Sequence, residues 1–283
     1  MSNNRSSFQP SETVLLASTT NVGRLFKGVA EQHTTDVAII EHNQKVTYGE
    51  LNNRVNQLAN ALTNKGLKRG DRIGLISRNC SSFLEIELAC AKTGIILVSI
   101  NWRLTREEVT HCMKLTQPSL VFFAAEFQKL LENIDEIELL LLQTEYENLL
   151  SNSHNKEPTD KVDKEDGLVI IFTSGTTGLP KGALISHRAM ITRALIFATE
   201  TGAPQKDTFI AWTPLFHMGS NDFSIATLLR GGQVVVVDGY RPKEIIKTIE
   251  EYAVHYLTLV PGMIADFIDQ LKLSKAKPKP IGL

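Results

Sequence analysis

Along most of the chain, short continuous apolar runs alternate with segments whose apolar residues recur at helical spacing. Short continuous runs are typical of strands buried on both faces, and the helical period is typical of the helices that cover such a sheet. Strands that alternate with helices usually connect in parallel. The sequence therefore predicts an α/β fold with largely parallel, layered sheets.

Three predicted helices begin with a hydroxyl residue followed three positions later by a carboxylate, which is the pattern of a capping box. These pairs are Thr47/Glu50, Ser82/Glu85 and Thr105/Glu108. Gly66 and Gly94 are expected to end the first two helices. Further helices are predicted with Ile191, Ala194, Leu195 and Ala198 on one face, over 219–230, and from about Pro242, which suits a first helical turn.

Strands are predicted at 72–77, 95–100, 119–123, 139–142, 168–173, 183–186, 208–212, 233–237 and 256–260. The polar stretch 151–166 interrupts this pattern and predicts a linker. We therefore expect an N-terminal extension over 1–24, a first α/β lobe over 25–165 and a second, incomplete lobe over 166–283. The Lys/Pro tail 272–280 is expected to be a solvated connection rather than an amphipathic helix.

The composition narrows the class of protein. Hydrophobic residues at 42% and charged residues at 22% are typical of a soluble globular chain and unlike collagen, disordered or membrane proteins. Thirty basic against 31 acidic residues argue against nucleic acid or an anionic bilayer as the main partner. No apolar stretch has the length of a signal peptide core or a transmembrane segment. The three cysteines show no zinc or disulfide spacing and are expected to be inert packing, so a cytoplasmic location is predicted.

A glycine-rich segment directly follows the predicted strand 168–173. Its glycines let the backbone approach a ligand closely and turn its amides inward. Its four hydroxyls and one ammonium are donors with no neighbouring carboxylate to repel an anion. The segment therefore predicts a phosphate-binding loop, made of Thr173, Ser174, Gly175, Thr176, Thr177, Gly178, Leu179, Pro180, Lys181 and Gly182.

Two other interpretations of this loop fit the sequence less well. A flexible Ser/Gly/Thr turn needs neither a Pro-Lys-Gly ending nor a preceding buried strand. The Walker loop of kinases and GTPases places Gly-Lys-Ser/Thr at the start of a long helix. Here Lys181 precedes Gly182, and a short apolar run follows.

At these residues the sequence resembles the adenylate-forming (AMP-binding) superfamily. Phe-Thr-Ser-Gly-Thr-Thr-Gly-Leu-Pro-Lys-Gly at 172–182 is similar to the family's phosphate loop, with Phe172 where tyrosine is common. Asn-Trp-Arg-Leu-Thr at 101–105 and Pro-Leu-Phe-His at 214–217 resemble two further family segments, in the expected order. With Met218 and Gly219, the last segment is more like the acyl-CoA synthetase branch. The resemblance covers roughly 25–283.

The resemblance implies the N-terminal large domain of an ATP-dependent acid–thiol ligase, which converts a fatty or other carboxylic acid to an acyl-adenylate and then to acyl-CoA. ATP, Mg²⁺ and coenzyme A are the implied cofactors and substrates. Contacts to the β- and γ-phosphates are expected from Thr173, Ser174, Gly175, Thr176, Thr177, Gly178 and Lys181.

Substrate contacts are expected from His217, Met218 and Gly219. His217 has a second interpretation, as a core histidine bonded to a carbonyl, and Trp212 and Phe216 fit packing equally well. Asn101 and Arg103 are expected to cap and brace their turn. No spacing makes Asp222 or Asp238 part of a metal site, so no metal ligand is assigned.

Family members are nearly twice as long, and their later segments carry the Tyr-Gly-x-Thr-Glu motif, the hinge and the small C-terminal domain with its lysine. None of these is in this sequence. We therefore expect a first half that has little or no ligase turnover by itself and that leaves sheet edges and apolar helix faces uncovered. It would need a missing C-terminal half or a homo-oligomeric partner. The alternative is a catalytically dead nucleotide-binding or regulatory module.

Overall fold

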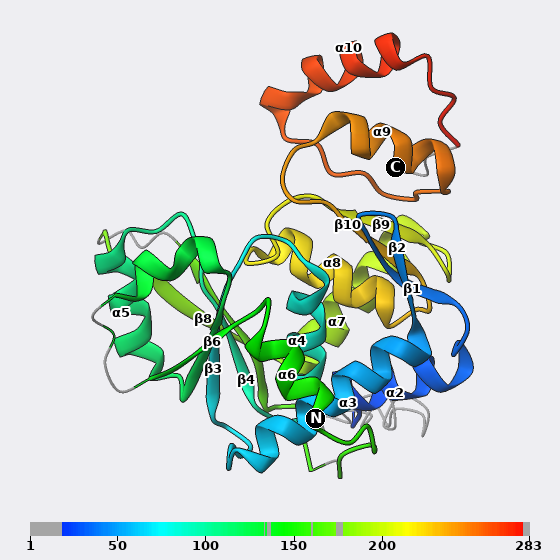
Figure 1. Ribbon diagram of the computed structural model, residues 1–283. Coiled ribbons are helices and arrows are strands. Elements are labelled where there is room, and N and C mark those ends of the chain that lie inside the picture. The colour runs from blue at the N-terminus through cyan, green and yellow to red at the C-terminus, as the bar shows by residue number, and fades with distance from the viewer. Residues whose placement is uncertain (1–18, 133, 135–136, 160, 174–177, 280–283) are drawn as a thin grey trace, which may run out of the picture.

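A computed structural model describes residues 19–132, 134, 137–159, 161–173 and 178–279. Within them the strands form two sheets (Figure 1). The six-stranded sheet has the order β6 (Glu138–Leu141), β5 (Leu120–Phe123), β3 (Arg72–Ile76), β4 (Ile96–Ser99), β7 (Gly167–Thr173) and β8 (Lys181–Ser186). The four-stranded sheet has the order β2 (Gln44–Thr47), β1 (Val37–Glu41), β10 (Gln233–Val236) and β9 (Thr208–Ala211).

Neighbouring strands are parallel in both sheets except at one end of each, where β8 runs antiparallel to β7 and β2 antiparallel to β1. The predicted largely parallel α/β class is therefore confirmed. Each sheet takes strands from both sides of the polar segment 152–166, because β1 pairs with β10 and β4 pairs with β7. The division into lobes at residue 165 stays a prediction.

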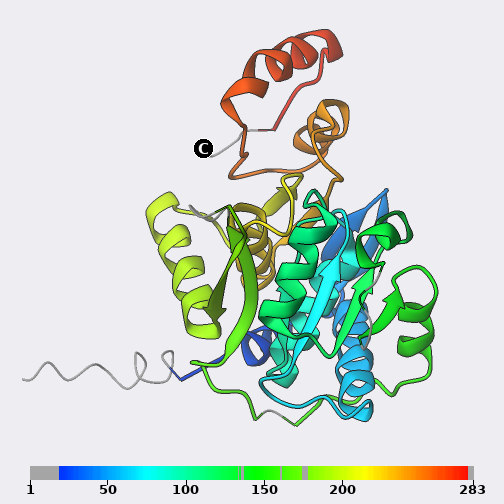
Figure 2. The same ribbon diagram turned by 90° about the vertical axis from the view of Figure 1, so that its left-hand side faces the viewer.

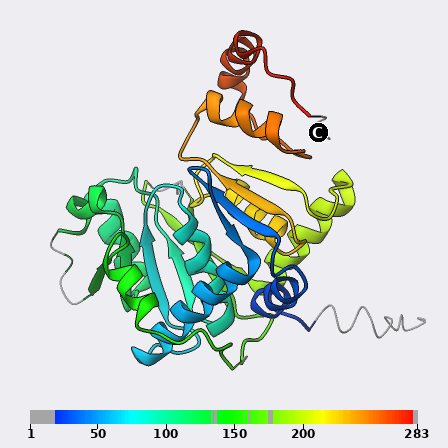
Figure 3. The same ribbon diagram turned by 45° about the vertical axis from the view of Figure 1, so that its right-hand side comes forward.

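The helices and sheets form alternating layers (Figure 3). The layer between the sheets buries apolar side chains of both in one continuous core, and it contains α2 (Val22–Gln32), α3 (Tyr48–Asn64), α4 (Ser81–Thr93) and α8 (Met218–Leu228). The outer face of the six-stranded sheet packs against α5 (Arg106–Thr116) and η1 (Ala125–Leu131). The outer face of the four-stranded sheet packs against α9 (Pro242–Glu251), and α10 (Ile264–Ser274) lies beyond α9 and packs against it.

The remaining elements lie at the margins. In Figure 2, the yellow-green α7 (His187–Thr201) and the adjoining β8 form one side of the molecule. The short helix α6 (Glu145–Ser151) lies against α3, and the turn η2 (Pro261–Met263) precedes α10. Residues 272–274 of the predicted tail form the end of α10, so the expected connection without a helix is wrong there. Residues 275–279 are mostly exposed, as predicted, and the Lys279 amide donates to the Ile249 carbonyl of α9.

Two of the three predicted capping boxes are present, at Thr47/Glu50 and Thr105/Glu108, each with both reciprocal hydrogen bonds. The prediction for Ser82/Glu85 is wrong: α4 begins one residue earlier, after Cys80, and has no side-chain cap. The buried carboxylate of Glu85 instead accepts hydrogen bonds from Arg54 Nε at 2.8 Å and Tyr146 Oη at 2.5 Å. A buried carboxylate needs such partners more than a helix end needs a cap.

Three other local predictions need correction. Leu195 is exposed on α7, while Ala194 is buried. The run 139–142 is a strand but lies at the sheet edge and is only partly buried. The predicted strand 256–260 is not formed: a single bridge joins Val254 to Thr208, and beyond it the Thr258 carbonyl accepts from Trp212 Nε1 at 2.8 Å. A hydrogen bond from the Trp212 side chain thus takes the place of the backbone ladder that a strand at 256–260 would have formed.

Candidate functional site

The predicted phosphate loop connects two neighbouring antiparallel strands. β7 ends at Thr173 and β8 begins at Lys181, and these two residues face each other in the ladder. Thr173 Oγ1 lies 3.5 Å from the Lys181 carbonyl oxygen. The segment is thus a closed hairpin loop, and its predicted residues Ser174, Gly175, Thr176 and Thr177 lie outside the described residues.

The described part of the loop has the features that an anion site requires. Gly178 has φ +93°, in the left-handed region that glycine adopts without strain. Thr173 and Lys181 are exposed. Among the described residues no carboxylate pairs with the Lys181 ammonium, so its charge is available to an incoming anion. His111 on α5 fixes the end of the loop, because its Nε2 donates to the Pro180 carbonyl at 3.1 Å.

The loop lies at the carboxyl edge of the parallel strands. β4 and β7 pair in parallel with Ser99 opposite Ile171, so Asn101 and Thr173, each two residues further along, leave the sheet at the same edge. In open α/β sheets, ligands bind outside the carboxyl ends of the strands. The topology therefore brings the segment 101–105 and the phosphate loop to one edge.

Asn101 and Arg103 form the brace that was predicted for this turn. Asn101 Oδ1 accepts the Arg103 amide at 2.9 Å. The Arg103 guanidinium lies over the Trp102 ring, 4.9 Å from its centroid, and over the Phe216 ring at 5.9 Å. Such cation–π contacts hold a guanidinium in place while leaving its donors free. Arg103 thus connects the turn after β4 with the segment after β9.

His217 is the N-cap residue of α8 and lies beside this arginine. Its ring is 4.5 Å from that of Phe216, which in turn meets Trp102 edge-on at 6.4 Å. Partial burial and the positive charge of Arg103 both lower the pKa of His217 below its ordinary value. The imidazole is therefore neutral at neutral pH. No hydrogen bond in the described part of the chain joins His217 to the phosphate loop.

Met218 and Gly219 form the first turn of α8. Their amides have no backbone acceptor among the described residues, as expected at a helix N-terminus. A Cβ at Gly219 would meet nothing within 4 Å, so this turn borders open space, whereas Met218 packs partly against the core. The first turn of α8 therefore presents amide donors beside a neutral imidazole.

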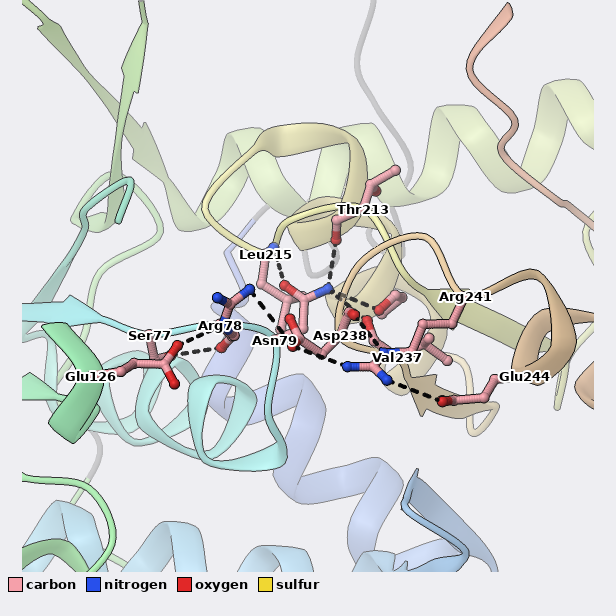
Figure 4. Close-up of polar contacts among 11 residues, drawn as sticks. Ser77, Arg78, Asn79, Glu126, Thr213, Leu215, Val237, Asp238, Arg241 and Glu244 are labelled. Atoms are coloured by element: carbon pink, nitrogen blue, oxygen red, sulfur yellow. Dashed lines mark hydrogen bonds and ion pairs between the residues drawn. The ribbon is translucent and has the colours of Figure 1, made fainter. Parts of the chain in front are cut away.

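Sequence reasoning missed Asn79, the central residue of Figure 4. Its side chain is buried at 8% exposure, in the turn between β3 and α4. Nδ2 donates to the carbonyl oxygens of Ala211, Thr213 and Val237 at 3.0, 2.8 and 3.1 Å, and Oδ1 accepts the Leu215 amide at 2.9 Å. The only signal in the sequence is a polar residue shortly after a buried strand.

The other candidates have structural roles. Asp238 lies 3.9 Å from Arg78 Nη1 and 3.7 Å from Arg241 Nη2, and Asp222 pairs with Arg193. Burial raises the pKa of all three cysteines, to about 12 for Cys80 and Cys112. Over the described ranges, no group of three or more His, Cys, Asp or Glu side chains could hold a metal ion, and no helix is long and apolar enough to cross a membrane.

Comparisons with known proteins agree with this geometry. The family model described as "AMP-binding enzyme" matches residues 26–281. The chain is 28% identical over 244 residues to a fatty acid–[acyl-carrier-protein] ligase, ScoC, of Streptomyces coeruleorubidus, which covers 83% of this chain and 47% of the relative. It is also 28% identical to a feruloyl-CoA synthase of Amycolatopsis, covering 77% and 44%. The chain spans about half the length of these curated relatives.

Solved structures share the fold. The inhibitor-bound N-terminal domain of FACL13 from Mycobacterium tuberculosis matches with a TM-score of 0.86 and 23% identity, over 92% of this chain and 68% of that one. The ATP-bound MatB of Rhodopseudomonas palustris matches with a TM-score of 0.74 and 22% identity, over 83% and 48%.

Proposed function

The chain belongs to the AMP-binding enzyme family, and on that premise we propose that it is the ATP-binding part of an acid–thiol ligase of the acyl-CoA synthetase type. In the first half-reaction, a substrate carboxylate oxygen attacks the α-phosphorus of ATP and pyrophosphate leaves, which gives an acyl-adenylate. In the second, a thiol sulfur, that of coenzyme A, attacks the acyl carbonyl and AMP leaves. The curated relatives with acyl-carrier-protein ligase and CoA synthase activities support this class.

The observation that carries the proposal is the hairpin between Thr173 and Lys181. The pairing of Thr173 with Lys181 fixes both ends of the loop next to each other, which limits the reorganisation that phosphate binding would require. The exposed ammonium of Lys181 supplies the positive charge for the phosphates. Ser174, Gly175, Thr176, Thr177 and Gly178 complete the proposed phosphate contacts.

We assign the acid to the neighbouring site at the start of α8. A neutral His217 does not form an ion pair with the substrate carboxylate and so leaves its oxygen free to attack. Met218 and Gly219 add amide donors in the first turn, where a developing negative charge is favoured. Partial burial, and secondly the charge of Arg103, lower the pKa of His217 and so favour the neutral imidazole.

The described residues do not provide the donor set of a metal site. Mg²⁺ prefers several oxygen ligands, which commonly come from carboxylates and phosphates.

Calorimetric titration of the chain with ATP and with AMP tests the proposal. Replacing Lys181 by Met removes a charged contact to the terminal phosphates, so ATP affinity is expected to fall about tenfold or more while AMP affinity stays the same. Lys243→Met, at an exposed position on α9, is the matched control. Equal ATP affinity for Lys181→Met and the unaltered chain would overturn the assignment of the loop.

A pyrophosphate-exchange assay then separates the two functional classes. We expect ATP binding with little or no exchange by these 283 residues alone. If exchange appears when a polypeptide carrying the later family segments is added, the chain is one half of a ligase. ATP binding without exchange under every such condition would favour a nucleotide-binding regulatory module. Robust exchange by the chain alone would refute its expected inactivity.

A further inference from the structure

The turn after β3 holds together the ends of strands from both sheets. β3 belongs to the six-stranded sheet, whereas β9 and β10 belong to the four-stranded sheet. Asn79 lies two residues beyond Ser77 in this turn and extends its carboxamide between the ends of β9 and β10 (Figure 4). Its contacts to Ala211 and Val237 are therefore made across the junction of the two sheets.

The same side chain fixes the segment that leads to His217. Asn79 Nδ2 donates to the Thr213 carbonyl, and Oδ1 accepts the Leu215 amide, so the turn 213–215 wraps around one carboxamide. From Leu215 the chain has two residues to reach His217, whose own amide donates to the Pro214 carbonyl at 3.0 Å. The backbone that carries the imidazole is thus anchored to Asn79 only two residues before His217.

Neighbouring groups brace this turn but do not replace the carboxamide. Arg78 extends away from it toward Glu126, with Nε 2.5 Å from Oε1, and lies over the Trp102 ring at 4.5 Å. Arg241 Nε donates to the Asp238 carbonyl at 2.9 Å. Among the described residues, only Asn79 bonds to both the 213–215 turn and the β9–β10 ends through its side chain.

We propose that Asn79 is a positioning residue for the acid-binding site: its carboxamide ties the 213–217 segment to the junction of the two sheets and so sets where His217 stands relative to Arg103. The role assigned to the site rests on the proposed function, but the positioning itself does not depend on any ligand. The position suits an asparagine, because its two Nδ2 hydrogens are shared among three carbonyl oxygens while its Oδ1 accepts one amide.

The test measures His217 in the ligand-free chain. Histidine side chains labelled with ¹³C are titrated by NMR, and the signal of His217 is assigned by its loss in His217→Gln. In Asn79→Ala the 213–217 segment is released from Arg103, so the titration midpoint of His217 is expected to rise toward the ordinary value for histidine. The midpoints of the other histidines are expected to stay unchanged.

Asn60→Ala is the matched control. Asn60 also donates from Nδ2 to three carbonyl oxygens, those of Asn56, His154 and Lys156, at 2.8, 2.9 and 2.8 Å, but it joins α3 to the polar linker. Its loss is expected to leave His217 unaffected. An unchanged His217 midpoint in Asn79→Ala, or an equal shift in Asn60→Ala, would overturn the proposal.

Hydrogen exchange in the unaltered chain gives a second test that does not require a variant to fold. The Leu215 amide is expected to exchange at least about tenfold more slowly than an unbonded amide, since its acceptor is a buried side chain. Unprotected exchange at Leu215 would contradict the proposal. ATP affinity, measured alongside, tests the proposed function separately.

Discussion

A buried carboxyl group between α4 and α8 makes the stability of the protein depend on pH. Glu87 is fully buried, and its Oε2 accepts from Asn221 Nδ2 at 2.5 Å. Its other oxygen has no partner among the described residues. Burial is the largest cause that raises the pKa of Glu87 to about 8, and the charge of Asp222 adds to it. The ordinary pKa of this carboxyl group, which applies to the unfolded chain, is 4.5. At a pH between these two values, Glu87 is therefore protonated in the folded protein and ionised in the unfolded chain.

The size of the effect follows from the two pKa values. A group whose pKa is raised in the folded state contributes most to stability below its unfolded pKa, and that contribution declines until the pH reaches the folded pKa. Each pH unit within this window changes the free energy of unfolding by up to about 1.4 kcal/mol. With a folded pKa of about 8, the contribution of Glu87 declines by about 2 to 3 kcal/mol between pH 5 and pH 7.

Glu87→Gln removes this dependence, because glutamine has nearly the same shape and stays neutral at every pH. Urea unfolding followed by tryptophan fluorescence at pH 5, 6, 7 and 8 gives the free energy of unfolding of each protein. The difference in the free energy of unfolding between the variant and the unaltered chain is expected to shift by about 2 to 3 kcal/mol in favour of Glu87→Gln from pH 5 to pH 7. Glu107→Gln, at an exposed position on α5, is the control. Parallel pH profiles for Glu87→Gln and the unaltered chain would refute the reasoning.

Two further predictions concern stability. Lys92 is buried and donates to Asn52, Asn56 and Glu157 at 2.6 to 2.8 Å. Lys92→Met is therefore expected to lower the free energy of urea unfolding by about 3 kcal/mol and to make the linker 152–159 sensitive to protease. A linker that stays resistant to protease in the variant would contradict this. Gly94 has φ +74° and an added Cβ would lie 2.9 Å from Arg69 Cγ, whereas Gly28 has open space within α2. In urea unfolding, Gly94→Ala is therefore expected to lower the free energy of unfolding by about 1 kcal/mol, and Gly28→Ala to raise it by about 0.5 to 1 kcal/mol. A Gly94→Ala variant more stable than Gly28→Ala would be incompatible with these backbone conformations.

Sequence patterns predicted the features that depend on nearby residues. The boxes at Thr47/Glu50 and Thr105/Glu108 form because both partners lie within one helical turn and nothing else competes for them. The box at Ser82/Glu85 fails because Glu85 is bonded by Arg54 and Tyr146, which lie 31 and 61 residues away. No local pattern contains that competition. The fold class and family were predicted correctly for the same reason, since the strand–helix alternation and the phosphate loop are both local.

The candidate site was predictable in part. The phosphate loop and His217 stand out as segments, but their arrangement depends on the order of strands within the sheets. Asn79 has a role only because the ends of β9 and β10 lie beside the turn after β3, although these segments are more than 130 residues apart. His111 likewise reaches Pro180 only because α5 lies next to the loop. Contacts between distant segments carry no periodic signal in the sequence.

The central claim is that the hairpin between β7 and β8 binds the phosphates of ATP. A crystal structure of the chain with a non-hydrolysable ATP analogue tests it most directly. We expect density for the β- and γ-phosphates within the loop 173–182, with the Lys181 ammonium in contact. An empty loop at saturating analogue, or phosphates bound instead in the cavity of about 450 Å³ between α9 and the four-stranded sheet, would contradict the account.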